Sequence, residues 1–338
     1  MRRSWSSLVS VFTLVSVLTL VPVLTLTATQ PALARQPEQD VVVNFADLAT
    51  ANCHNPEGIA VAPDGTLFAA GLSGNICVVS PAGKVTRVIR VPPGPAGVTN
   101  LLGELFVEDK TLYVVDIADF TANGTHALGR ALKVDVESGT TRTLADGFLA
   151  PNGIAQDEEG TLFVSDSFAG AIYKVDPEVG GRTLWKQDVK LRTTGSPPFG
   201  ANGIAFDRDG RFLYVANTGD SAILRIPVNA DGSAGDVQVF AKGASAADPK
   251  LLHGADGIAF DVHGQLWVCA NQADEIQVLS RTGSLVARFS GTGSNTLHFP
   301  ASLVFHKRAL YVTNLYFGAF GGKLSVLGVP FRGQPLTP

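Results

Sequence analysis

The 338-residue chain is poor in charge, in cysteine and in runs of basic residues. Only 17% of its residues are charged and the formal net charge is −4, so the chain lacks the positive footprint of a nucleic-acid-binding protein. Three cysteines are too few for a scaffold built from disulfides. Cys269 lies in an apolar strand and is expected in the core. Cys53 and Cys77 flank one repeat unit, and the sequence leaves open whether they pair.

Long apolar runs are also rare, and the one candidate lies at the N-terminus. Two arginines precede an apolar stretch over 8–26, which Ala32-Leu33-Ala34 follows. This order is typical of a secretory signal peptide. The stretch is long enough to be an uncleaved membrane anchor, but Pro22 and the cleavage site favour removal after Ala34. We therefore predict a signal peptide over 1–34, export to the periplasm or the medium, and a single domain over 35–338 without a stable membrane span.

One sequence unit recurs along the chain. Asn202-Gly-Ile-Ala-Phe-Asp-Arg-Asp-Gly and Asp256-Gly-Ile-Ala-Phe-Asp-Val-His-Gly are two clear copies. The six copies start near positions 57, 102, 152, 202, 256 and 302. Each unit contains four short apolar segments separated by turn residues such as Asp209-Gly210, a hairpin signal. No amphipathic helix competes, so the pattern predicts an all-β, six-bladed β-propeller with four antiparallel strands per blade.

The last unit lacks a fourth strand, because Val329-Pro330 follows the apolar segment 324–327 and the chain ends soon afterwards. The apolar segment 41–45 stands before the first unit without a partner. We therefore predict that this N-terminal strand completes the sixth blade and closes the ring. Closure protects the strand edges that an open blade would expose.

The position just before the first strand of each unit carries candidate ligands. In a propeller the innermost strands begin around the mouth of the central channel, so side chains at this position converge. They are Glu57, Asn152, Asn202 and Asp256. Two carboxylates and two amide oxygens are hard ligands. The set predicts one divalent cation, with Ca²⁺ as the first expectation and Mg²⁺, Mn²⁺ or Zn²⁺ as alternatives.

A simpler reading makes these Asn-Gly and Asp-Gly pairs ordinary turn dipeptides. However, the hairpin turn of each unit lies seven residues later, at Asp64-Gly65, Glu159-Gly160, Asp209-Gly210 and His263-Gly264. The earlier pairs are not needed as hairpins. Four oxygen-bearing residues at one register therefore favour the metal site.

With these motifs in place, the chain resembles the senescence marker protein/gluconolactonase (regucalcin-like) family of six-bladed propeller hydrolases. The likeness is carried by Pro151-Asn152-Gly153, by Ala201-Asn202-Gly203-Ile204 and by Ala255-Asp256-Gly257-Ile258. The family places Glu, Asn, Asn and Asp around one cation in blades one, three, four and five, the order found here. Gly153 departs from the family, in which many lactonases carry Asp after this Asn.

The resemblance implies metal-dependent hydrolysis of a lactone or another small ester, with Asp256 as the base that takes a proton from water. A cation at the channel mouth would polarise the ester carbonyl. His253 lies three residues before Asp256 and is the candidate second acid/base, with His298 next. Aromatic residues in the mouth-side loops, Phe120, Phe199, Tyr316, Phe317 and Phe320, predict a small-molecule substrate with a hydrophobic portion.

Two other classes of function remain open from the sequence. A non-catalytic exported propeller would bind a ligand or a protein through the same face, because fold does not determine function. A propeller lyase or condensing enzyme would work without a metal, and the four-ligand set favours the hydrolase over it. The oligomeric state is not indicated by the sequence.

Overall fold

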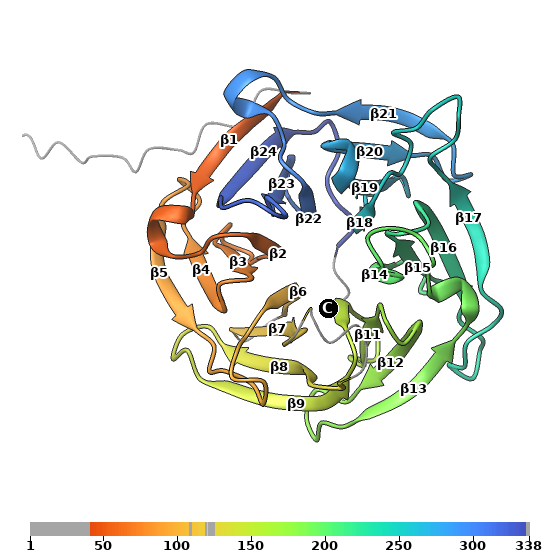
Figure 1. The fold of residues 1–338 in the computed structure, drawn as a ribbon, viewed down its shortest axis with the longest axis horizontal. Coiled ribbons are helices and arrows are strands. Elements are labelled where there is room, and N and C mark those ends of the chain that lie inside the picture. Colours follow the sequence, from red (N-terminus) through yellow and green to blue (C-terminus); the bar gives the residue numbers. More distant parts are fainter. Residues whose placement is uncertain (1–40, 108–109, 119, 121–125, 336–338) are drawn as a thin grey trace, which may run out of the picture. The chain divides into compact units, whose positions relative to one another are not determined.

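The computed structural model describes residues 41–107, 110–118, 120 and 126–335. Within these residues the strands form six separate four-stranded antiparallel sheets, and no α-helix is present. The sheets are arranged as blades around a central axis (Figure 1). The predicted six-bladed β-propeller is therefore confirmed. The predicted signal peptide over 1–34 lies outside the described residues.

Each of the first three blades takes four consecutive strands, the first of which is innermost. Blade 1 contains β2 (Pro56–Val61), β3 (Leu67–Gly71), β4 (Asn75–Val79) and β5 (Val85–Arg90). Blade 2 contains β6 (Leu101–Val107), β7 (Thr111–Asp116), β8 (Gly129–Asp135) and β9 (Thr141–Phe148). Blade 3 contains β10 (Pro151–Gln156), β11 (Leu162–Asp166), β12 (Ala171–Val175) and β13 (Arg182–Gln187).

The next two blades repeat this order, and the sixth combines both ends of the chain. Blade 4 contains β14 (Ala201–Phe206), β15 (Phe212–Asn217), β16 (Ala222–Pro227) and β17 (Gln238–Lys242). Blade 5 contains β18 (Ala255–Phe260), β19 (Leu266–Ala270), β20 (Glu275–Leu279) and β21 (Leu285–Phe289). Blade 6 contains β22 (Pro300–His306), β23 (Ala309–Asn314), β24 (Lys323–Gly328) and β1 (Val42–Asp47). Four 3₁₀ turns complete the assignment: η1 (Ala49–Ala51), η2 (Val189–Leu191), η3 (Asn271–Ala273) and η4 (Gly293–Asn295).

The ring is closed by the pairing of β1 with β24. Val42 lies opposite Leu327, and Asp47 lies opposite Lys323, in an antiparallel register. The predicted N-terminal closing strand is confirmed, and it extends two residues beyond the predicted segment 41–45. Because β24 would otherwise present an unpaired edge, β1 satisfies its backbone hydrogen bonds.

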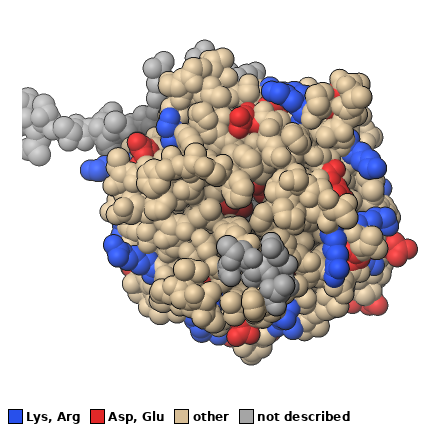
Figure 2. Space-filling view, in the orientation of Figure 1, with Lys and Arg blue, Asp and Glu red and all other residues tan. Residues whose placement is uncertain are grey.

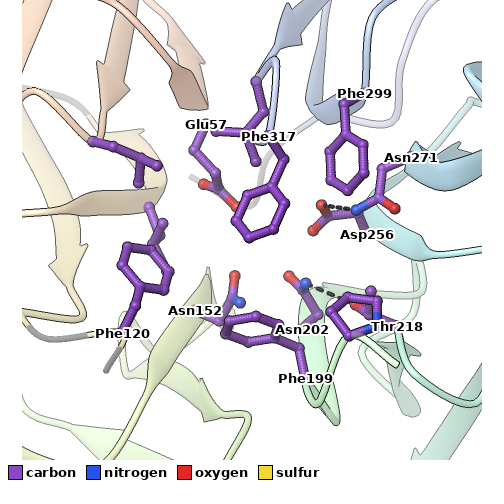
Figure 3. A pocket seen from close by; sticks show the side chains of 14 residues that line it. Glu57, Phe120, Asn152, Phe199, Asn202, Thr218, Asp256, Asn271, Phe299 and Phe317 are labelled. Atoms are coloured by element: carbon purple, nitrogen blue, oxygen red, sulfur yellow. Dashed lines mark hydrogen bonds between the residues drawn. The ribbon is translucent and has the colours of Figure 1, made fainter. Parts of the chain in front are cut away.

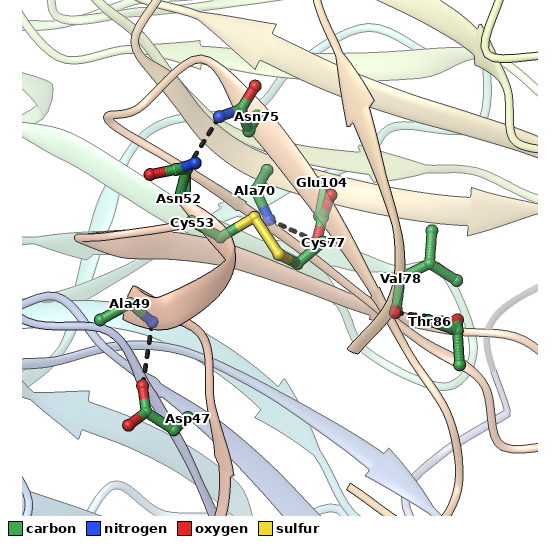
Figure 4. Close-up of a disulfide and its surroundings, with 10 residues drawn as sticks. All are labelled: Asp47, Ala49, Asn52, Cys53, Ala70, Asn75, Cys77, Val78, Thr86 and Glu104. Carbon is green, nitrogen blue, oxygen red and sulfur yellow. Dashed lines mark hydrogen bonds between the residues drawn. A yellow bond between two sulfur atoms is a disulfide. The ribbon is translucent and has the colours of Figure 1, made fainter. Parts of the chain in front are cut away.

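The core consists of apolar clusters where neighbouring blades pack together. Phe163 of blade 3, for example, packs edge-on against Phe206 of blade 4, with ring centroids 5.0 Å apart. A disulfide joins Cys53 to Cys77 in the cluster beside β1, with the two Cα atoms 6.1 Å apart (Figure 4). The structure thus decides the cysteine pairing that the sequence left open, and Cys269 is buried and unpaired as expected.

The C-terminal segment covers the end of the channel at which the innermost strands end. Gln334 donates its backbone N–H to the Phe260 carbonyl (2.8 Å) and its side-chain amide to the Phe206 carbonyl (3.3 Å). Both acceptors end innermost strands. The channel is therefore approached from the opposite mouth, where the innermost strands begin. No helix of the described segments is long and apolar enough to cross a membrane.

Candidate active site

A β-bulge at the start of each innermost strand positions the candidate ligands. The register of β10 with β11 shifts between Pro151 and Ile154, and β14 and β18 shift at the equivalent places. The bulge positions of the six blades are Glu57, Leu102, Asn152, Asn202, Asp256 and Ala301. A bulge redirects a side chain from the regular alternation of a strand. Here it places the four predicted ligands at one level of the channel.

The glycine after each ligand serves blade packing. A Cβ at Gly203 would lie 2.4 Å from the Asp256 carbonyl oxygen, and a Cβ at Gly153 would lie 2.5 Å from that of Asn202. Such distances are too short for any side chain, so only glycine lets adjacent innermost strands approach this closely. The Asn-Gly pairs are therefore bulge elements inside strands, and the simpler turn reading of the sequence is wrong.

The four predicted ligands line one pocket at the channel mouth. In Figure 3 the side chains of Glu57, Asn152, Asn202 and Asp256 point toward a common centre. Each is only 4–5% exposed. The space-filling view shows charged residues mostly at the periphery of this face, with acidic atoms at the bottom of the central hollow (Figure 2). The polar floor is thus buried beneath a mostly uncharged surface.

Asp256 is held by one partner and has one oxygen free. Asn271 Nδ2 donates to Asp256 Oδ2 at 2.8 Å, whereas Oδ1 is buried without a hydrogen-bond partner. Burial raises the pKa of Asp256 to about 7, although the hydrogen bond from the Asn271 amide opposes the rise. This value belongs to the metal-free carboxyl, and a cation bound beside it would favour the carboxylate and lower the pKa.

Glu57 is the second buried carboxyl of the floor. Its Oε2 has no hydrogen-bond partner. Burial raises the pKa of Glu57 well above its usual range, and the nearby charges of Asp256 and Glu104 raise it further. Two buried carboxyls that repel each other are costly unless a cation or a proton neutralises them.

The two asparagines are oriented by hydroxyl groups of their own blades. Asn202 Nδ2 donates to Thr218 Oγ1 at 2.8 Å, and Asn152 Nδ2 donates to Ser167 Oγ at 3.4 Å. Thr218 Oγ1 in turn donates to the Ala255 carbonyl, so the hydroxyl is fixed. Because the amide nitrogens are engaged outward, the amide oxygens are available to the pocket, as Figure 3 shows.

These residues fit a divalent cation. Free oxygens of Glu57 and Asp256 supply two negative charges, and the amide oxygens of Asn152 and Asn202 add neutral ligands. In the described part of the chain, no group of three or more His, Cys, Asp or Glu is placed to bind a metal. The donor set therefore depends on the two amides as well as the two carboxylates.

Polar residues at or just after the end of a blade's second strand divide into two groups. Asp116, Asp166 and Asn314 accept backbone N–H groups, as expected for residues that stabilise turns. Asn271 instead contacts Asp256, a role that sequence reasoning missed. The signal was its position, one residue beyond the strand end Ala270, which matches Ser167 and Thr218 in blades 3 and 4.

The predicted second acid/base lies apart from this floor. His253 occupies the turn before β18, where its backbone N–H donates to the Lys250 carbonyl (3.2 Å), and it does not line the described pocket. His298 is exposed and stacks on Tyr316, with ring centroids 4.9 Å apart. A catalytic role for His253 stays a prediction.

The fold and the floor define a class of protein, namely a six-bladed propeller with an oxygen-rich site at the channel mouth. Residues 178–315 match the family model described as SMP-30/gluconolactonase/LRE-like region, and residues 45–79 match that of the strictosidine synthase-like N-terminal region. The chain therefore carries an SMP-30/gluconolactonase/LRE-like region, which confirms the predicted family resemblance. No curated protein shows a significant match.

Solved structures support the same fold. A gluconolactonase from Xanthomonas campestris is 19% identical, with a TM-score of 0.63 over 86% of this chain and 89% of that one. A regucalcin from Agrobacterium tumefaciens, described as a calcium-binding protein, is 18% identical, with a TM-score of 0.60 over 84% and 93%. Virginiamycin B lyase from Staphylococcus aureus is 16% identical, with a TM-score of 0.55 over 87% and 88%. At such identities the likeness establishes the fold alone.

Proposed function

We propose that the chain is a metal-dependent hydrolase that acts on a lactone or another small ester with a hydrophobic portion. One observation carries this proposal: Glu57 Oε2 and Asp256 Oδ1 are buried without hydrogen-bond partners in a pocket that also contains the amides of Asn152 and Asn202. Two unneutralised carboxyls at the floor of a pocket favour a cation there. The match to the gluconolactonase-type family model supports ester hydrolysis.

Glu57, Asn152, Asn202 and Asp256 would hold the cation, with Ca²⁺ as the first candidate. A cation bound there would polarise the ester carbonyl and stabilise the negative charge that develops on its oxygen. Hydroxyl groups of Ser167 and Thr218 keep the two amide nitrogens turned outward, so the oxygens stay available for binding.

Asp256 is the proposed general base. Its Oδ1 has no hydrogen-bond partner, and its Oδ2 accepts one hydrogen bond from Asn271. Because each carboxylate oxygen has two lone pairs, Asp256 can contribute a ligand and still accept the proton of the attacking water. Asn271 fixes the rotamer that brings Oδ1 into the pocket.

The proposal is tested by titrating the dialysed protein with Ca²⁺ while hydrolysis of a panel of aryl esters and lactones is followed. We expect turnover to rise with Ca²⁺ and to disappear with a chelator. Metal binding without turnover of any ester would favour the non-catalytic binding propeller instead. Turnover that is indifferent to divalent cations would contradict the metal site.

We also propose that the protein is exported and that its signal peptide is removed after Ala34. The Cys53–Cys77 disulfide supports export, because such bonds persist mainly in oxidising compartments. N-terminal sequencing of the protein from its native host tests this, and a mature N-terminus at Arg35 is expected. Recovery of the uncleaved chain would contradict it.

A further inference from the structure

The pocket is polar only at its floor. The polar lining residues are Glu57, Asn152, Asn202, Thr218, Asp256 and Asn271. The wall above them is apolar and includes Leu72, Leu102, Phe199, Phe299, Leu315 and Phe317. Lys, Arg and His are absent from the lining that the described residues provide. The described residues of the wall thus offer no side-chain donor or acceptor to substrate hydroxyl groups and no positive charge to an anionic group.

Aromatic rings stand on two sides of this wall. Phe199 packs against Phe120 and Phe168, with ring centroids 6.2 Å and 5.2 Å away. Phe299 stacks on Phe317 with centroids 5.5 Å apart, on the other side of the pocket (Figure 3). Phe317 is 50% exposed although it is a large apolar residue. Exposed aromatic surface at a pocket mouth is available for an apolar ligand to cover.

Phe299 has a backbone conformation that is unfavourable for a bulky residue. Its φ is +55°, in the left-handed region that a bulky residue rarely adopts. The equivalent residues before the innermost strands of blades 1 and 5 are Asn55 and Gly254, which tolerate this region. Asp274 Oδ1 accepts the backbone N–H of Phe299 at 2.7 Å and stabilises the conformation. Strained residues of this kind gather at ligand sites.

From these observations we propose that the site selects uncharged lipophilic lactones, whose apolar tail lies between Phe199 and the Phe299–Phe317 pair. Polyhydroxylated sugar lactones are disfavoured, because their hydroxyl groups would lose water without gaining partners from the wall. Anionic lactones are disfavoured because the described lining residues include no cationic side chain. This inference rests on the proposed hydrolase function and names its substrate class.

The test compares three δ-lactones, namely δ-valerolactone, δ-decalactone with its pentyl tail, and D-glucono-δ-lactone. We expect kcat/KM for δ-decalactone to exceed that for δ-valerolactone at least about tenfold, because the tail leaves water. Gluconolactone should be the poorest of the three. A δ-decalactone to δ-valerolactone ratio near one, or gluconolactone as the best substrate, would overturn the proposal.

A matched pair of variants locates the selectivity. Phe299→Asn keeps a residue that tolerates positive φ, as Asn55 does in blade 1, and removes the ring. It should lower the ratio of kcat/KM for δ-decalactone to that for δ-valerolactone at least about threefold. Phe331→Asn, in the C-terminal segment beside His263, is the control and should leave the ratio unchanged. An unchanged ratio in folded Phe299→Asn, verified by its melting temperature, would refute the role of this wall.

A binding measurement separates this inference from the hydrolase proposal. The lactam 6-pentylpiperidin-2-one resists hydrolysis and is titrated by calorimetry beside unsubstituted piperidin-2-one. Tighter binding of the pentyl lactam without turnover of any lactone would refute the hydrolase and sustain the lipophilic pocket. Lactone turnover with equal affinity for both lactams would sustain the hydrolase and refute the pocket selectivity.

Discussion

Asn271 Nδ2 donates to Asp256 Oδ2 at 2.8 Å, and this contact leaves Asp256 Oδ1 as the free oxygen at the channel mouth. The pair lies within blade 5, across the first hairpin. Gly254 makes room for it, because a Cβ there would lie 2.0 Å from Asn271 Oδ1. Asn271 is therefore a positioning residue for the proposed base.

Asn271→Ala is expected to lower kcat and to move the rising limb of the pH–rate profile to higher pH. The amide lowers the pKa of Asp256, so its removal raises that pKa and delays formation of the carboxylate. Because the lost hydrogen bond is made to a charged group, we expect kcat to fall about tenfold or more. Profiles at saturating Ca²⁺ measure this, with Asn229→Ala in an exposed turn as the control. A profile identical to wild type would contradict the positioning role.

Asp256→Asn is expected to abolish most hydrolysis while the fold persists, because the change keeps the shape and removes one charge and the base. Metal affinity should weaken without being lost. Glu57→Gln should also weaken metal binding, but its turnover should recover substantially at saturating metal if Glu57 is only a ligand. Calorimetric metal titration and steady-state kinetics on both variants check this. Near-normal turnover of Asp256→Asn at saturating metal would remove Asp256 as the base and make His253 the next residue to test.

The chelated protein is expected to lose stability as pH rises from about 4 to 7. Burial raises the pKa of Asp256 from 3.8 to about 7, so in this window the folded state binds more protons than the unfolded chain, and stability falls with pH. Asp256 contributes at most about 4 kcal/mol to this loss, and the raised pKa of Glu57 adds to it. Urea unfolding in EDTA at pH 5 and 7.5 measures it. Asp256→Asn should show a flatter dependence, and an equal slope in that variant would contradict the assignment.

The disulfide gives a fourth prediction. Reduction of Cys53–Cys77, or its replacement by two alanines, should lower the free energy of unfolding by about 2–4 kcal/mol, because the crosslink restricts the unfolded chain. Urea titrations with and without reductant measure the change. Thiol counting on the unfolded, unreduced protein should find one free thiol, that of Cys269. Three free thiols would show that the bond does not form.

Removal of the closing strand should destabilise the ring. A chain that begins at Leu48 lacks β1, so β24 presents an unpaired edge. We expect a lower melting temperature and self-association in size-exclusion chromatography, compared with a chain that begins at Val41. A monodisperse truncated protein with an unchanged melting temperature would show that closure by β1 is dispensable.

Much of the fold was predictable because a propeller consists of hairpins between neighbouring segments and because the same sequence unit recurs in each blade. Hairpins such as the one around Asp209-Gly210 join neighbouring segments, so short-range patterns identify the strands. Six copies of the unit then set the number of blades. The missing outer strand of the last unit even indicated the long-range pairing of β1 with β24.

Parts of the site were not predictable, because they depend on where side chains meet across strands and blades. The contact of Asn271 with Asp256, for example, follows from the register of β18 with β19, which the sequence alone does not show. The strained backbone of Phe299 leaves no sequence signal either.

The sequence by itself determined the propeller, its closing strand and the four residues that meet at the channel mouth, because repetition places equivalent positions on one ring. Only the tertiary structure decided the Cys53–Cys77 bond, the free oxygens of Glu57 and Asp256, and the apolar wall above them. The physical reason is that hydrogen-bond partners, burial and pKa depend on atoms brought together from different blades, and no single stretch of sequence contains them.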